Sequence, residues 1–319
     1  MIIVVVEHEG GAAGAASLEA LTFARGLGGE PLHGVAFGEG ASAALTAAGA
    51  FGVRTGTSVS LEGGYAPAAW AQVVADLAGA VEASAVVAAG TDRGHEVLAH
   101  LAAKTSSPFV ANCVTAARSD DGWLVTRQRW GGSLLEDAAV RAPFAVLGVA
   151  LHAVAPEPTG DAEAVAIDMS APAPGDADLR VRATRVAAAA DAAASLADAR
   201  LVVGGGRGVG SAEGFASLDA LAAVLGGVVG VSRAVTSAGW RPHAQQVGQT
   251  GERIAPDLYI ACGISGASQH MVGCRGAKKL LAINSDPDAP ILAKADYGVI
   301  GDLHQVVPAI TAEVARRNV

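Results

Sequence analysis

The sequence predicts an α/β protein built from two doubly wound domains with mostly parallel sheets. Short runs of valine, isoleucine and alanine recur along the chain, and alanine-rich segments that suit helices lie between them. Strands that alternate with helices in this way are typical of a parallel sheet with helices on both faces. The chain has 319 residues and the rhythm restarts near residue 200, so we expect two hydrophobic cores rather than one.

The first half contains three strand-like runs, IIVVV (2–6), HGVAF (33–37) and SAVVAAG (84–90). After residue 108 the pattern changes. SDDGWLVTRQRW (119–130) combines a turn with alternating residues, and no helical segment separates it from AVLGVAL (145–151). Since antiparallel strands need only a short connection, we expect an antiparallel extension of the first sheet.

A segment rich in small, acidic and proline residues separates the two halves. It includes AVAPEPTGDAEAV (153–165) and VAAAADAAASLADAR (186–200). This composition places the domain boundary between residues 185 and 199. We set it after residue 190, which gives an N-terminal domain of residues 1–190 and a C-terminal domain of residues 191–319.

The second half repeats the strand-helix pattern. Its strand-like runs are LVVGG (201–205), GVVGVSR (227–233), LYIAC (258–262), LLAIN (280–284) and YGVIG (297–301). The last segment, LHQVVPAITAEVARR (303–317), has a helical period but contains Pro308, so we expect a helix that bends or begins late. In such a doubly wound sheet, ligands bind at the carboxyl ends of the strands, near the point where the strand order reverses.

Composition excludes several classes of function. The formal net charge of -9 argues against a nucleic acid as the partner. No stretch approaches the roughly 18 apolar residues that a membrane span requires, so we expect no direct membrane insertion. The first residues show no basic or long apolar leader, and we therefore expect a cytoplasmic location.

Metal and disulfide chemistry is not indicated. Cys113, Cys262 and Cys274 form no CxxC pair and are odd in number, which predicts buried, reduced thiols. HEVLAH (95–100) invites a zinc interpretation, but HExxH needs its second histidine one residue earlier. We predict no metal site.

The carboxyl ends of the strands in the second half carry the strongest functional signal. They are followed by hydrogen-bonding or charged side chains, namely Arg207, Ser232, Arg233, Gln249, Thr250, Ser265 to His270, Asn284 and Asp302. Such a row suits a dinucleotide. Backbone amides near Ser265 and Gly266 would bind phosphate oxygens. Arg207 would supply a charge partner and Asp302 an acceptor for ribose hydroxyls.

The usual dinucleotide fingerprint is absent. GGGRGVGS (204–211) satisfies GxGxxG in no phase, and no GxxxxGK[ST] motif occurs in the chain. The sequence therefore does not support NAD binding in the ordinary manner.

The C-terminal half resembles the FAD domain of the electron transfer flavoprotein α subunit family. The motifs that carry the resemblance are GQTG (248–251), GISGASQH (263–270), AIN (282–284) and ADYGVIGDL (295–303), with GGRG (205–208) and SRA (232–234) in order upstream. SLEALTFARGLG, TDRGHEVLAHLAAKT and ANCV in the first half are similar to the first domain of the family. The resemblance covers nearly the whole chain and is most specific after residue 200.

This resemblance implies that the C-terminal domain holds FAD. Arg207, Ser265, Gly266, Ala267, Ser268 and Gln269 would serve the pyrophosphate region, and Asn284 and Asp302 the adenosine and ribityl parts. Ser232, Arg233, Gln249, Thr250 and His270 would surround the isoalloxazine ring, and Gly248 completes the implied FAD-binding set.

The resemblance also implies partners. A β subunit of related fold would pack against the N-terminal domain and complete a heterodimer. The FAD would carry electrons from a flavin dehydrogenase, such as an acyl-CoA dehydrogenase of fatty acid β-oxidation, to a membrane quinone reductase. The chain would then be an electron carrier rather than an enzyme that converts a substrate. Two alternatives stay open: an NADH-dependent, electron-bifurcating heterodimer with a second flavin in the β subunit, and a scaffold subunit that has lost FAD.

Electrostatic energies indicate which side chain should influence the flavin potential more. A flavin that carries single electrons gains negative charge, and a guanidinium about 4 Å away is worth about 4 kcal/mol at an effective dielectric of about 20. This corresponds to about 170 mV as an upper bound. A charge-assisted hydrogen bond from His270 is worth about 1.5–3 kcal/mol, or about 65–130 mV. We therefore expect Arg233 to be the larger influence, and the pKa of His270 to rise as the ring gains charge.

Three positions near the implied cofactor site depart from the family pattern. Glu252 stands where lysine commonly follows GQTG, Ser285 where lysine usually follows AIN, and Ser237 where aspartate is usual. Two positive charges are thereby lost, and we expect this loss to affect the FAD affinity and the redox potential. RQRWGGSLLEDAAV (127–140) also departs from the family's usual segment, which bears on the choice of partner.

Overall fold

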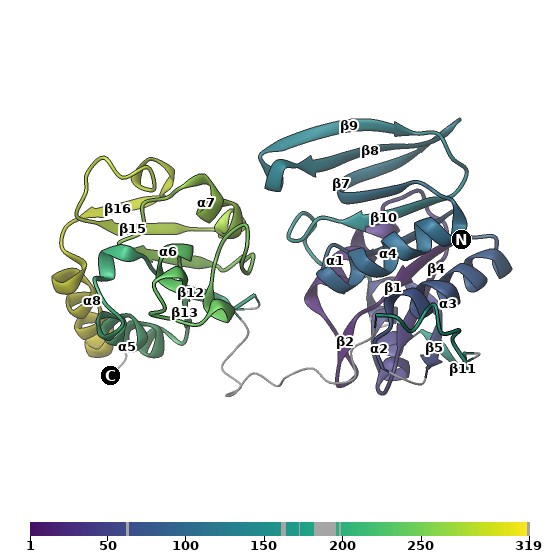
Figure 1. The fold of residues 1–319 in the computed structure, drawn as a ribbon, viewed down its shortest axis with the longest axis horizontal. Coiled ribbons are helices and arrows are strands. Elements are labelled where there is room, and N and C mark those ends of the chain that lie inside the picture. Colours follow the sequence, from purple (N-terminus) through teal and green to yellow (C-terminus); the bar gives the residue numbers. More distant parts are fainter. Residues whose placement is uncertain (62–63, 161–163, 172, 182–195, 198, 318–319) are drawn as a thin grey trace. The chain divides into compact units, whose positions relative to one another are not determined.

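The computed structural model describes residues 1–61, 64–160, 164–171, 173–181, 196–197 and 199–317. The chain forms two compact units, Met1–Ala188 and Ala189–Val319 (Figure 1). Each unit has its own sheet and its own hydrophobic core. The predicted boundary after residue 190 falls within 182–195, which lie outside the described residues.

The N-terminal unit is built around one nine-stranded sheet. Its strands are β1 (Ile2–Val5), β4 (Leu32–Phe37), β5 (Val53–Ser60), β6 (Ala85–Ala89), β7 (Phe109–Ser119), β8 (Gly122–Arg129), β9 (Leu134–Val140), β10 (Ala145–Val149) and β11 (Val165–Ser170). Two further short strands, β2 (His8–Glu9) and β3 (Ala12–Ala13), form a separate hairpin. Its helices are α1 (Ala15–Arg25), α2 (Ala41–Ala48), α3 (Pro67–Ala80) and α4 (Asp92–Thr105).

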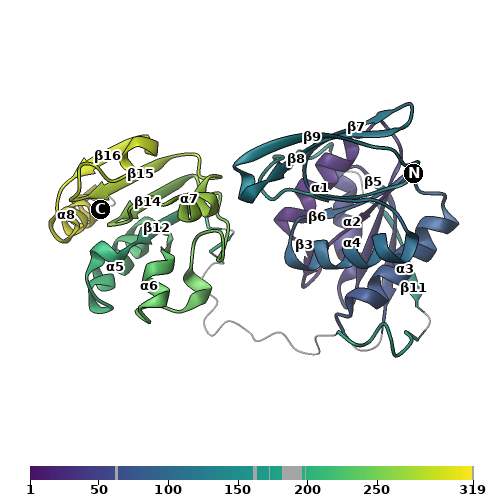
Figure 2. The same ribbon diagram turned by 45° about the horizontal axis from the view of Figure 1, so that its top comes forward.

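The strand order of this sheet is β11-β5-β4-β1-β6-β10-β7-β8-β9. All pairs from β11 to β7 are parallel, whereas β7, β8 and β9 pair antiparallel and extend the sheet at one side (Figure 2). The predicted α/β class and the antiparallel extension are confirmed.

Several strands of this unit were not predicted, among them the short β2 and β3 as well as β5 and β11. β5 has the sequence VRTGTSVS, whose serine, threonine and glycine content gives no apolar run. Its buried Thr57 is tolerated because its hydroxyl hydrogen-bonds Nε2 of His33 on β4 at 2.9 Å. β11 lies at the sheet edge with most of its side chains exposed, so residue 165, read from the sequence as part of a linker, instead begins a strand.

The C-terminal unit contains a five-stranded parallel sheet. Its strands are β12 (Leu201–Gly205), β13 (Val228–Val231), β14 (Leu258–Cys262), β15 (Leu280–Asn284) and β16 (Tyr297–Ile300). Its helices are α5 (Ala216–Leu225), α6 (Arg233–Ser237), α7 (Ser268–Cys274) and α8 (Leu303–Arg317). The strand order is β13-β12-β14-β15-β16, so the order reverses between β12 and β14. The predicted doubly wound parallel sheet is confirmed.

The period-two alternation of the strands divides the C-terminal core into two layers. Val203 and Ile260 face one layer, in which α5 and α8 contribute Leu218 and Val307. Val202 and Tyr259 face the other, which contains Cys274 of α7. Tyr259 therefore lies beneath α7.

The last helix begins earlier than predicted. α8 starts at Leu303 and contains Pro308 in its interior. Proline cannot bond the carbonyl four residues before it, here that of His304. Both Pro308 and His304 are exposed, so water can hydrate that carbonyl. Of the two expectations, a bend or a late start, the late start was wrong.

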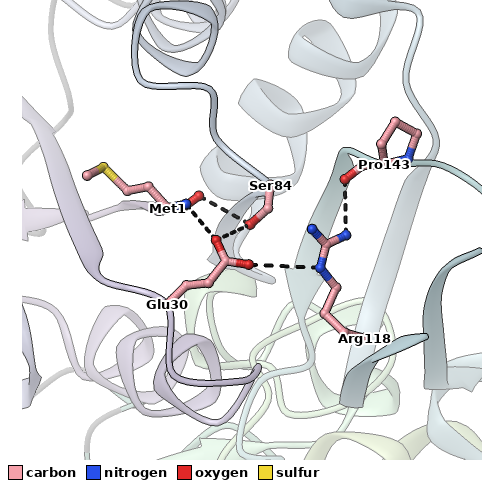
Figure 3. Close-up of polar contacts among 5 residues, drawn as sticks. All are labelled: Met1, Glu30, Ser84, Arg118 and Pro143. Carbon is pink, nitrogen blue, oxygen red and sulfur yellow. Dashed lines mark hydrogen bonds and ion pairs between the residues drawn. The ribbon is translucent and has the colours of Figure 1, made fainter. Parts of the chain in front are cut away.

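A polar network joins separate elements of the N-terminal unit (Figure 3). Glu30 accepts hydrogen bonds from the Met1 amino group and from the Ser84 hydroxyl, the latter at 2.7 Å, and lies 3.8 Å from Arg118. Arg118 also donates to the Pro143 carbonyl at 3.1 Å. Burial by itself would raise the pKa of Glu30, but the bonds from Met1 and Ser84 outweigh it and lower the pKa.

Glu30→Gln is expected to destabilise the protein by about 1 kcal/mol at pH 7, because the ionised carboxylate accepts these bonds. The folded-state pKa is lowered from its ordinary value of 4.5, so this stability is present above that value and is lost as pH falls through the folded pKa. The difference in melting temperature between wild type and variant should therefore shrink as the pH is lowered from about 5 to about 3. Glu157→Gln is the control, since Glu157 is 73% exposed in a 3.7 Å pair with Arg25. A constant difference across this range would contradict the assignment.

All three cysteines are buried and free, as predicted. Burial raises the pKa of Cys113, Cys262 and Cys274 to about 12, so the thiols stay protonated near neutral pH. Among the described residues, no helix combines the length and apolar character needed to cross a membrane.

Candidate functional site

A cavity of about 660 Å³ lies at the carboxyl edge of the C-terminal sheet. Eleven of the fourteen residues predicted for the site line it: Arg207, Ser232, Arg233, Gly248, Gln249, Thr250, Ser265, Ala267, Gln269, His270 and Asn284. They come from the segments that follow β12, β13, β14 and β15 and from the loop between β13 and β14. The cavity thus lies where the strand order reverses, the usual ligand position of this fold.

Three predicted residues, Gly266, Ser268 and Asp302, do not line the cavity. Gly266 has φ +82°, and a Cβ added to it would lie 2.6 Å from the Ile291 amide nitrogen. Ser268 is exposed at the start of α7. Asp302 accepts a hydrogen bond from the His304 amide at 2.9 Å and so caps α8.

Glycines allow the loops after β12 and β14 to touch backbone to backbone. The Gly206 amide donates to the Cys262 carbonyl at 2.9 Å, and the Gly208 amide to the Gly263 carbonyl at 3.1 Å. A Cβ on Gly206 would lie 2.2 Å from the Gly263 oxygen. The glycines of GGGRG (204–208) therefore allow the two loops to approach closely, and this approach holds Arg207 at the cavity rim.

A hydrogen-bond chain that passes through the buried Gln246 ends at Thr250. The Thr236 hydroxyl donates to Oε1 of Gln246 at 2.6 Å, and Nε2 of Gln246 donates to the Thr250 hydroxyl at 3.0 Å. Gln246 is 2% exposed, whereas Thr236 is half-buried and Thr250 is exposed, so the chain is shielded from water at its centre. Because Thr250 already accepts from Gln246, its own hydrogen is left to donate into the cavity.

His270 lies at the first turn of α7 and is 7% exposed. Its Nε2 is 2.8 Å from the Tyr259 hydroxyl, whereas its Nδ1 has no hydrogen-bond partner among the described residues. Burial lowers the pKa of His270 to about 4, and the Val247 carbonyl opposes this shift only in part. The ring is therefore neutral at physiological pH.

Asn284 connects the end of β15 to the loop after β14. Its Nδ2 donates to the Ile264 carbonyl at 2.9 Å, and its Oδ1 accepts from the Asp286 amide at 3.0 Å. One hydrogen of the side-chain amide remains for a ligand. The side chain thus has a structural role as a strand-end turn residue in addition to lining the cavity.

The charged lining comprises Arg207, Arg233 and Asp286, all of them exposed. Two cations against one carboxylate favour an anionic ligand. Sequence reasoning missed Gln246 and Asp286. Gln246 lies two residues before the GQTG motif, but only its burial shows that it contacts Thr250.

No group of three potential metal ligands occurs in the part of the chain that the structure describes. His95 and His100 both lie on α4, in the N-terminal unit.

Two family models match the chain. Residues 2–174 match the electron transfer flavoprotein domain, and residues 195–275 match the electron transfer flavoprotein FAD-binding domain. The second match contains every cavity residue named above from Arg207 to His270. The C-terminal unit is therefore an FAD-binding domain of this family.

Curated relatives agree over nearly the full length. The electron transfer flavoprotein subunit alpha of Mycobacterium leprae is 38% identical over 321 residues, covering 99% of this chain and 98% of the relative. That of Mycobacterium tuberculosis H37Rv is 39% identical over 336 residues, covering 99% of each. Protein FixB of Clostridium saccharobutylicum is 32% identical over 251 residues, covering 78% of this chain and 75% of the relative. The chain belongs to the electron transfer flavoprotein α subunit family.

Proposed function

We propose that this chain is the FAD-holding subunit of a heterodimeric electron transfer flavoprotein. It takes electrons from a flavin dehydrogenase of acyl-CoA dehydrogenase type and passes them towards a membrane quinone reductase, in the cytoplasm. The observation that carries the proposal is the convergence of eleven expected residues on one cavity at the switch point of the sheet. When bound, FAD supplies the one-electron redox chemistry.

The residues of the cavity fit this group. The volume of about 660 Å³ falls within the range of about 300–1,000 Å³ typical of sites for organic ligands. Of the two guanidinium groups that line the cavity, Arg207 suits the pyrophosphate and Arg233 the isoalloxazine ring. The orphaned Nδ1 of His270 is a buried polar atom that a ligand oxygen would satisfy.

We assign the parts of FAD to parts of the cavity. Arg207 and the turn from Ser265 to Gln269 bind the pyrophosphate, and Asn284 serves the adenosine and ribityl portions. Asp302, expected to share this role, caps α8 outside the cavity and is assigned no part of FAD. The isoalloxazine lies among Ser232, Arg233, Gln249, Thr250 and His270, with Gly248 at its edge. Because His270 is neutral, its hydrogen bond is of the weaker kind, worth about 0.5–1.5 kcal/mol, which leaves Arg233 as the larger influence on the potential.

The N-terminal unit is proposed to receive the β subunit. Its antiparallel extension exposes large apolar side chains, Leu124 (55%), Trp130 (82%), Leu134 (56%) and Leu135 (67%). Trp123, by contrast, is 0% exposed and belongs to the core. Exposed apolar side chains that gather on one extension are typical of an interaction surface.

The visible spectrum of the purified heterodimer tests the proposal. We expect one FAD per heterodimer, reducible by an acyl-CoA dehydrogenase with its substrate and not by NADH. A colourless heterodimer would refute FAD binding and favour the alternative of a scaffold subunit that has lost FAD. Two FADs that bleach with NADH would favour the bifurcating alternative. Co-expression with a β-like gene from the same genome supplies the partner.

A further inference from the structure

The contact between Tyr259 and His270 has a definite hydrogen-bond polarity. Tyr259, on β14, is 0% exposed, and its hydroxyl lies 2.8 Å from Nε2 of His270. His270 lines the cavity, and its Nδ1 is unpartnered among the described residues. The Val247 carbonyl acts on the same ring without meeting the geometry of a hydrogen bond.

A neutral imidazole carries one hydrogen, on either Nδ1 or Nε2. If Nε2 carried it, the Tyr259 oxygen would accept, and the tyrosine hydrogen would be buried without an acceptor in the described part of the chain. A buried donor left unpaired is the costliest arrangement. If Nδ1 carries the hydrogen, Tyr259 donates to Nε2, and the donor left unpaired is the Nδ1–H of a cavity-lining residue, which a bound ligand can satisfy.

The hydroxyl of Tyr259 has little freedom to leave this position. A Cβ on Gly204 of β12 would lie 2.2 Å from the Tyr259 oxygen, so the tyrosine occupies the space that this glycine leaves. Burial raises the pKa of Tyr259 well above its ordinary value, so it keeps its hydrogen at any physiological pH.

We propose that Tyr259 is a positioning residue that donates to Nε2 of His270, fixes the Nδ1–H tautomer, and thereby makes His270 a hydrogen-bond donor into the cavity. The acceptor is a carbonyl oxygen of the bound ligand, and for the isoalloxazine this inference rests on the proposed function. The donor strengthens as negative charge develops on that oxygen, so the contact raises the reduction potential.

Two substitutions of His270 separate the two ring nitrogens. Asparagine places an amide nitrogen near the position of Nδ1, and glutamine places one near Nε2. In the FAD-loaded heterodimer, we expect His270→Asn to retain most of the one-electron potential. His270→Gln should lower it by about 40 mV, the equivalent of a roughly fivefold change for one neutral hydrogen bond. The proposal would be overturned if both variants lowered the one-electron potential equally, or if His270→Gln retained more of it than His270→Asn.

Nitrogen NMR of the histidine rings reads the tautomer directly. In ¹⁵N-histidine heterodimer, the signals that vanish in His270→Gln should show a protonated Nδ1 and a bare, hydrogen-bonded Nε2. Tyr259→Phe, which keeps the ring and its packing, should shift the Nε2 signal and lower the potential with little change in melting temperature. A protonated Nε2 in wild type, or a Tyr259→Phe protein with neither change, would contradict the assignment.

The same measurement separates this inference from the proposed function. If the heterodimer holds no FAD, the proposed function fails, yet the NMR of that FAD-free pair still reports the tautomer of His270. If FAD is bound but the tautomer is Nε2–H, the positioning role fails alone.

Discussion

Arg233→Ala is expected to lower the one-electron potential of bound FAD while the heterodimer still retains the flavin. Arg233 lines the cavity and is exposed in this chain. One cation about 4 Å from the developing charge is worth about 1 kcal/mol in water and about 4 kcal/mol at an effective dielectric of about 20. The expected fall in the one-electron potential is therefore about 40–170 mV. A larger fall would indicate that the partner subunit excludes more water from the surroundings of Arg233.

Two variants serve as controls for this prediction. Arg233→Lys keeps the charge but loses the planar guanidinium, so part of the potential should be retained. Arg207→Ala removes the cation assigned to the pyrophosphate and should reduce FAD retention more than it changes the potential. Spectroelectrochemical titration of each heterodimer measures the effect. An unchanged potential in Arg233→Ala that still holds FAD would refute the role of this residue.

Gly266→Ala is expected to cause the largest loss of stability and to release FAD, although Gly266 does not line the cavity. Its φ of +82° is strained for alanine, at a cost of about 1–2 kcal/mol. A Cβ there would also lie 2.6 Å from the Ile291 amide nitrogen. That amide is held by a 3.1 Å hydrogen bond to the Ser265 carbonyl. Relieving the clash should cost about 1–3 kcal/mol more.

Gly226→Ala is the matched control. Gly226 ends α5 with φ +68°, and a Cβ added there would meet no heavy atom within 4 Å, so only the backbone strain is present. Chemical unfolding should give a loss of about 1–2 kcal/mol for Gly226→Ala and about 2–5 kcal/mol for Gly266→Ala. FAD content, measured by absorbance, should fall only in the latter. Equal stability and equal FAD content in both variants would show that the turn does not need this close approach.

The fold class and eleven of the cavity-lining residues were predicted from the sequence. Apolar runs separated by helical segments encode a parallel sheet, and all parallel strands bring their carboxyl ends to one edge. The polar residues that follow those runs, such as Arg207, Ser232 and Ser265, could therefore be assigned to one site before their contacts were known. The burial of the cysteines was predicted from their odd number and their lack of CxxC pairing.

The tertiary structure alone decided which strand ends are neighbours. Asp302 follows β16, the edge strand, which lies about 12 Å from the switch point at the usual strand spacing, and there it caps α8. Asn284 is the last residue of the inner strand β15 and lines the cavity. Local periodicity tells which side chains face outward at a strand end, but strand order decides how far each lies from the ligand.

The polarity of the site also depends on contacts that no local pattern contains. Tyr259 reads as a core residue, and only the packing of α7 on β14 brings its hydroxyl to Nε2 of His270. Gln246 becomes the link from Thr236 to Thr250 only once the loop folds over it. Sequence patterns record burial and exposure, whereas hydrogen-bond direction requires the distances between side chains that the fold brings together.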